Sequence, residues 1–117
     1  MKIVKEILSE DCFDGNFIKE FTVDRVLNDD WISYLKQFGK VQCLTNLEKP
    51  FYSFDKKYFF TIKGLLNENN IKVIFRRNNM NATIEYFYAL LQYFNCSEDN
   101  IQIIHNIEKK ILKTIEI

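Results

Sequence analysis

Hydrophobic and polar residues alternate along the chain with two different periods. A period of two, which is typical of a half-buried strand, covers five runs: residues 2–8, 17–23, 41–45, 58–66 and 71–77. A period near 3.6, which is typical of an amphipathic helix, covers three runs: residues 28–39, 81–95 and 97–117. The pattern therefore predicts the element order β-β-α-β-β-β-α-α.

Polar residues at the starts of the predicted helices support this order. Asn28 is a favourable N-cap, and the two aspartates after it suit the positive first turn of a helix. Asn81 and Ser97 are predicted to cap the other two helices. Residues 101–107 leave an alternative, because their Ile-Gln-Ile alternation also fits a strand. In that case residues 17–107 approach the β-α-β-β-α-β order of ferredoxin-like folds.

The fold class follows from the balance of elements and from the connections. Strands outnumber helices and most connections are short, which favours antiparallel pairing with the helices on one face. We expect an α+β two-layer sandwich with a mainly antiparallel sheet of about five strands. With one proline and no internal repeat, residues 1–117 are predicted to form a single domain in which residues 97–117 are a C-terminal helical extension.

The two long β runs in the middle of the chain are predicted to form a hairpin around residues 67–70. Pairing Leu66 with Ile71 gathers the apolar residues of both strands on one face, whereas a slip of one residue would add Lys63 to that set. The opposite face then carries both cations and apolar groups. Gly64 within the first strand indicates either a close approach of a ligand to the backbone or room for an aromatic neighbour.

The composition of the chain excludes several classes of protein. Its 117 residues include 16 Lys or Arg and 16 Asp or Glu, so the net charge is zero, which excludes a globally basic nucleic-acid coat. No apolar run is long enough for a spanning helix, and we expect no membrane association. Cys12, Cys43 and Cys96 are odd in number and widely spaced. This spacing argues against a disulfide framework and favours the cytoplasm.

The zero net charge hides an uneven distribution. Residues 40–77 carry eight Lys or Arg against three Asp or Glu, whereas the segments on either side are acidic. In the chosen register the outer face of the central hairpin carries five candidate ligand-binding residues: Phe59, Lys63, Lys72, Ile74 and Arg76. Lys40, Lys49, Lys56, Lys57 and Arg77 are close enough in sequence to extend this basic patch. Interleaved cations and apolar groups suit an anionic ligand with a flat part, although the same lysines also protect sheet edges from pairing.

The residues needed for several kinds of chemistry are missing or wrongly spaced. The cysteines and His105 lack the spacing of a zinc site, Cys43 is better explained as a buried apolar residue, and three glycines leave no phosphate-binding loop. We therefore predict no catalytic residues, no metal and no cofactor, and expect a non-enzymatic interaction protein that contacts a protein partner or itself. The alternative is binding of an anionic ligand, such as single-stranded nucleic acid, on the hairpin's outer face.

Overall fold

A computed structural model of the chain describes residues 1–11, 16–44, 46, 48–76, 80–94 and 98–114. Its centre is a six-stranded sheet in the order β1-β2-β6-β5-β4-β3, in which each pairing is antiparallel. The strands are β1 (Ile3–Asp11), β2 (Asn16–Leu27), β3 (Lys40–Leu44), β4 (Phe51–Lys56), β5 (Phe60–Leu65) and β6 (Glu68–Arg76). The predicted α+β class with a mainly antiparallel sheet is confirmed.

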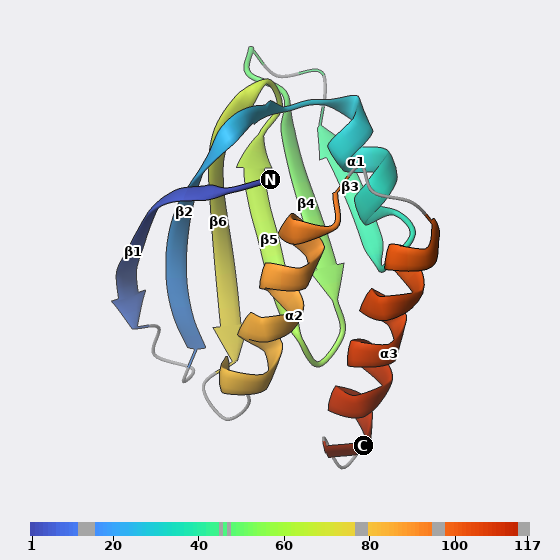
Figure 1. Cartoon of the computed structure of the whole chain (residues 1–117). Helices are drawn as coiled ribbons and strands as arrows, with labels where there is room; N and C mark the ends of the chain where they lie inside the picture. The colour runs from blue at the N-terminus through green and yellow to red at the C-terminus, as the bar shows by residue number, and fades with distance from the viewer. Residues whose placement is uncertain (12–15, 45, 47, 77–79, 95–97, 115–117) are drawn as a thin grey trace.

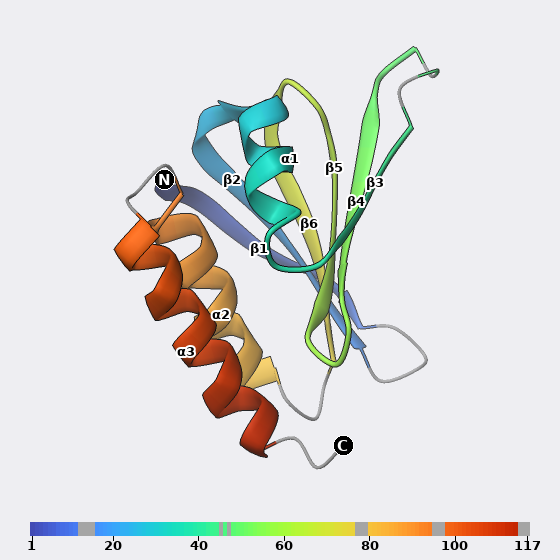
Figure 2. The same ribbon diagram turned by 90° about the vertical axis from the view of Figure 1, so that its right-hand side faces the viewer.

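Three helices lie on one side of this sheet (Figures 1 and 2). They are α1 (Asp29–Leu35), α2 (Met80–Gln92) and α3 (Glu98–Thr114). Helix α2 packs on β6, and α3 packs against α2. Since Ile104 and Ile111 of α3 are buried with the main core, the C-terminal helix completes the helix layer. No helix of the described ranges covers the opposite face of the sheet (Figure 2).

The capping residues in the sequence predicted the start of α1 correctly. The Asp30 N–H donates to the Asn28 side-chain oxygen at 3.0 Å, so Asn28 is the N-cap as predicted. Asn81 is not a cap, because α2 already begins at Met80, and Ser97 lies outside the described residues. Residues 101–107 are helical, which excludes the strand needed for a ferredoxin-like order. Helical packing against α2 buries Ile104, whereas a strand there would have needed a free sheet edge.

Strand β4 is the element that the periodicity missed. Its sequence places aromatic residues on both faces, with Phe51 on one side and Tyr52 and Phe54 on the other, so the alternation of apolar and polar positions is lost. The buried Tyr52 hydroxyl accepts a hydrogen bond from Trp31 Nε1 at 3.1 Å and anchors α1 on the sheet. The sheet therefore has six strands rather than five.

The central hairpin has a different register from the one predicted. Ile71 is opposite Gly64 rather than Leu66, and β5 and β6 are joined by the two residues Leu66 and Asn67. Asn67 has φ 65°, a left-handed conformation that asparagine tolerates better than most residues. Because the shift equals two residues, each side chain keeps its face. A Cβ on Gly64 would lie 2.7 Å from the Tyr52 hydroxyl, so this glycine makes room for an aromatic neighbour.

Candidate binding surface

The face of the sheet opposite the helices, here called the outer face, is the candidate site. Alternation along each strand sends Phe21, Val23, Ile62, Val73 and Phe75 into the core and the residues between them outward. One row of outward positions runs across the sheet from Ile7 on β1 through Glu20, Lys72, Lys63 and Ser53 to Gln42 on β3. The outer face is thus polar and charged along its middle.

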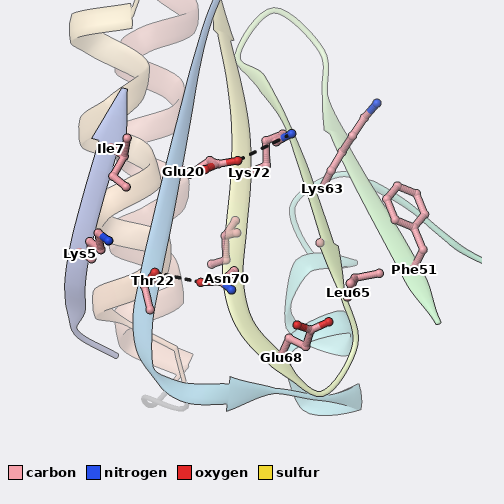
Figure 3. Close-up of a pocket in the computed structure, with 12 residues that line it drawn as sticks. Lys5, Ile7, Glu20, Thr22, Phe51, Lys63, Leu65, Glu68, Asn70 and Lys72 are labelled. Carbon is pink, nitrogen blue, oxygen red and sulfur yellow. Dashed lines mark hydrogen bonds and ion pairs between the residues drawn. The ribbon is translucent and has the colours of Figure 1, made fainter. Parts of the chain in front are cut away.

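A hollow of about 580 Å³, here called the central hollow, lies on this face and spans β1, β2, β6, β5 and β4 (Figure 3). Its lining consists of cationic, acidic, polar and apolar groups: Lys5, Ile7, Glu20, Thr22, Phe51, Lys63, Gly64, Leu65, Glu68, Asn70, Ile71 and Lys72. The Thr22 hydroxyl and the Asn70 side-chain oxygen lie 2.9 Å apart and are hydrogen-bonded across the floor. Phe51 and Leu65 are opposite each other in the β4–β5 ladder and give one end of the hollow an apolar wall.

Two lysines are directly opposite each other in the middle of the outer face. Lys63 of β5 pairs with Lys72 of β6, an arrangement of like charges that destabilises a sheet. Lys72 has an acidic neighbour on its other side, since its Nζ lies 3.8 Å from a carboxylate oxygen of Glu20. The residue on the other side of Lys63 is Ser53. Positive charge is therefore concentrated where the hollow crosses β5. An acidic group bound in the hollow would reduce the repulsion between the two ammonium groups.

The structure places four of the five predicted ligand-binding residues on the outer face. Lys63 and Lys72 line the central hollow. Ile74 and Arg76 line a smaller hollow of about 290 Å³ beside it. Placing Phe59 on this face was wrong, because the side chain is fully buried and its ring packs against Tyr86 of α2 with centroids 5.1 Å apart.

A turn before β5 explains the burial of Phe59. Tyr58 has φ 69°, which reverses the chain, and β5 begins only at Phe60. Strand alternation therefore does not extend back to Phe59, and both phenylalanines point into the core. Of the basic residues expected to extend the patch, Lys56 also turns to the helix side, where it meets Glu108, and Arg77 lies outside the described residues.

The residue cluster around Lys56 is a feature that sequence patterns did not reveal. The Lys56 ammonium donates to the Phe38 carbonyl and forms an ion pair with Glu108 of α3. It also lies 5.7 Å from the ring centroid of Phe59 and 5.6 Å from that of Tyr86. Burial lowers the pKa of Lys56 to about 8, while the Glu108 carboxylate favours the charged form. No local signal indicates this pair, since its partners are far apart in the chain.

The remaining candidate residues do not come together. His105 Nδ1 lies 3.8 Å from a Glu108 carboxylate oxygen, which is beyond hydrogen-bond distance, and its ring packs on Phe38. Cys43 is exposed rather than buried, because it lies in the short edge strand β3, most of whose residues are exposed. Cys12 and Cys96 are outside the described residues.

The described residues contain neither a metal-binding cluster nor a membrane-spanning helix. Within those ranges no three His, Cys, Asp or Glu side chains are grouped so that they could hold a metal ion. No helix there is both long and apolar enough to cross a membrane.

Comparisons of the chain with protein-family models, with curated proteins and with solved structures find no match. The function therefore has to be inferred from the geometry and charge of the outer face.

Proposed function

We propose that the chain is a non-enzymatic binding protein and that its outer face binds a second protein through a surface with both acidic and apolar groups. One observation carries this proposal. The central hollow lies on a sheet face that no helix of the described chain covers, and it combines lysines from three strands with the apolar side chains of Ile7, Phe51 and Leu65.

The extent of the face suits a protein better than a small molecule. Six strands spaced about 4.8 Å apart, with ladders of about six residue pairs, cover roughly 600 Å² before the relief of the side chains is counted. A standard protein interface buries about 800 Å² on each partner. Sites for small molecules instead enclose most of the ligand surface, whereas the lining of the central hollow is spread over five strands (Figure 3).

The charges of the central hollow indicate what the partner presents. Lys5, Lys63 and Lys72 outnumber Glu20 and Glu68, so a partner with a few acidic groups among apolar ones matches best. Single-stranded nucleic acid is a weaker match. Such ligands stack successive bases on aromatic rings, and with Phe59 buried, Phe51 is the one aromatic residue among those that line the hollow. The two glutamates also repel phosphate.

A peptide-display selection tests the proposal. The wild-type protein is screened against a random peptide library, and the enriched peptides are then measured against two charge-reversal variants. Lys63→Glu/Lys72→Glu changes the central hollow, whereas Lys109→Glu/Lys110→Glu makes the same charge change at exposed positions of α3. We expect enrichment of peptides with Asp or Glu beside apolar residues, and loss of their binding in the first variant alone.

Two results would contradict the proposal. The first is enriched peptides that bind the Lys63→Glu/Lys72→Glu variant as well as they bind the wild type. The second is tight binding of an oligothymidylate probe that weakens steeply with salt and depends on the same two lysines, since that behaviour is typical of nucleic-acid recognition.

A further inference from the structure

A hollow of about 610 Å³, here called the Lys56 hollow, lies between α3 and the turn that joins β4 to β5. Lys57 and Tyr58 of this turn line one side, and Glu108 and Leu112 of α3 line the other. No residue of the described ranges lines both this hollow and the central hollow, so the two are separate sites. The volume is in the range of about 300–1,000 Å³ that is typical of sites for small ligands.

The walls of the Lys56 hollow are largely apolar. Tyr58 and Leu112 are half-buried, which leaves part of each side chain exposed to a ligand. The rings of Phe38 and Phe59 are buried beneath this surface. A ligand with an apolar body would therefore displace water from aromatic and aliphatic groups, which is favourable.

The amine of Lys56 differs chemically from that of an exposed lysine. Its side chain is 13% exposed, and the ammonium lies 5.7 Å from the ring centroid of Phe59. Burial lowers the pKa of Lys56 to about 8, so about a tenth of these amines are neutral at pH 7, against about 0.03% of lysines with the ordinary value of 10.5. A lysine that is desolvated in an apolar pocket is the type that forms Schiff bases with carbonyl compounds.

Glu108 is the group beside Lys56 that can exchange protons with it. The other charged or titratable groups that line the hollow or contact this pair are Lys40, Asp55, Lys57, Tyr58, Tyr86 and His105. The Glu108 carboxylate forms an ion pair with the ammonium, which favours the charged amine, but burial outweighs this effect because the pKa is still lowered. A base in contact with a nucleophile is the arrangement that activates the nucleophile.

We propose that the Lys56 hollow binds an aldehyde with an apolar body and that Lys56 forms an imine with it. The ammonium gives a proton to Glu108, and the free amine attacks the carbonyl carbon to form a C–N bond. A proton moves from the nitrogen to the former carbonyl oxygen, which gives a carbinolamine. Glu108 then returns its proton to the hydroxyl group, which leaves as water while the nitrogen lone pair forms the C=N bond. The product is a protonated imine beside the Glu108 carboxylate, and nothing is oxidised or reduced.

The surroundings of Lys56 favour an aldehyde over other ligands. The amine is reached only through the small exposed part of its side chain, and an aldehyde carbon carries one substituent where a ketone carbon carries two. A carboxylate is a weaker match, because Glu108 already balances the charge of Lys56 and Asp55 lies opposite Lys40 in the β3–β4 ladder. An uncharged carbonyl compound needs no further cation.

Reductive trapping tests the proposal with the full chain. The protein is treated at pH 7 with benzaldehyde and cyanoborohydride, which reduces an imine to a stable amine, and the labelled lysines are identified by peptide mass spectrometry. Lys56 should be labelled at least about tenfold faster than Lys109, which is exposed on α3, because a larger fraction of its amines is neutral. The ratio of the two rates should fall between pH 7 and pH 10, since exposed lysines lose their proton mainly over that range.

A second aldehyde and two variants separate a ligand site from a merely reactive amine. Acetaldehyde lacks the apolar body, so its labelling of Lys56 relative to Lys109 should be weaker than that of benzaldehyde. Lys56→Arg keeps a cation beside Glu108 and should remove the fast site. Lys110→Arg makes the same exchange at an exposed position of α3 and is the matched control, which should label like the wild type.

Three results would overturn the proposal: equal labelling of Lys56 and Lys109, a ratio that does not change with pH, or no preference for benzaldehyde over acetaldehyde. The site and the proposed binding function can fail independently. Lys63→Glu/Lys72→Glu should abolish peptide binding and leave the labelling of Lys56 unchanged, whereas Lys56→Arg should do the reverse. Thermal unfolding followed by circular dichroism confirms that each variant is folded.

Discussion

The ion pair between Lys56 and Glu108 is expected to hold α3 against the sheet. Lys56 is the last residue of β4, and Glu108 lies in the middle of α3. Their side chains are only 13% and 18% exposed. Lys56→Met keeps most of the apolar stem but removes the ammonium, so the Glu108 carboxylate and the Phe38 carbonyl both lose their cationic partner.

The change in the free energy of unfolding depends on which buried groups each substitution leaves without a partner. Removing one member of a fully buried ion pair costs about 3–5 kcal/mol, and a hydrogen bond to a charged group contributes about 1.5–3 kcal/mol. Partial exposure of both side chains reduces these values, and the lowered pKa of Lys56 means that burying its ammonium costs more than its partners return. The two effects offset each other, so Lys56→Met should change the free energy of unfolding by less than about 1 kcal/mol, whereas Glu108→Leu, which leaves the ammonium buried without its carboxylate, should cost about 2–3 kcal/mol.

Urea denaturation of a double-mutant cycle measures this contribution. The cycle consists of the wild type, Lys56→Met, Glu108→Leu and the double variant. If the two side chains stabilise each other, the double variant should be more stable than the sum of the single losses predicts, with a coupling energy of about 1–3 kcal/mol. Additivity within about 0.5 kcal/mol, or a Glu108→Leu variant as stable as the wild type, would refute the reasoning.

Three further predictions concern pH, a close contact and the corrected residue. The pKa of Lys56 is about 8 in the folded protein against 10.5 for an ordinary lysine. The unfolded chain therefore holds the extra proton between these values, and stability should rise with pH there. Thermal melts from pH 8 to pH 10 should show the wild type gaining stability relative to Lys56→Met, and parallel curves would contradict this. Gly64→Ala should cost about 1–3 kcal/mol in urea denaturation, because its Cβ would lie 2.7 Å from the buried Tyr52 hydroxyl. The Cε1 and Cζ atoms of the Tyr52 ring would lie 2.9 Å from that Cβ as well. The loss in Gly64→Ala combined with Tyr52→Leu should therefore be smaller than the sum of the two single losses, and full additivity would place the strain elsewhere. Phe59→Ala should cost about 3–5 kcal/mol, since the ring is fully buried. The half-buried Ile74→Ala should cost clearly less, and equal losses would argue against the burial of Phe59.

Most properties that depend on neighbours in sequence were predicted correctly, although the N-cap expected at Asn81 was wrong. The N-cap at Asn28 and the acidic first turn of α1 rest on contacts within three residues, so the local sequence specifies them. Which residues of β5 and β6 point to the core was also predicted correctly, even though the register between the two strands was wrong by two residues. Alternation determines which side of a strand is buried, and a shift of an even number of residues leaves that side unchanged.

Properties that depend on distant partners were decided by the tertiary structure. Strand β4 has apolar residues on both faces: Tyr52 bonds Trp31 of α1 on the helix side, and Phe51 lies opposite Leu65 of β5 at the central hollow. These neighbours cannot be read from its own sequence. Phe59 is buried because the turn at Tyr58 ends the strand alternation and α2 covers the ring.

The candidate surface shows the same division between local and distant causes. Lys63 and Lys72 were predicted from alternation alone, and they line the central hollow. The sequence could not reveal that Lys5, Glu20 and Phe51 join them, since sheet order brings together strands that are far apart in the chain. Lys56 was expected to extend the patch, but it lies on the helix side of β4 with Tyr52 and Phe54. Its partner Glu108 could not be foreseen, because an ion pair between distant residues exists only once the chain has folded. By itself, the amino-acid sequence determined the local conformations and the buried side of each strand that it identified. Which residues share one surface, and which of them meet a charge partner, was decided by the pairing of strands and the docking of helices.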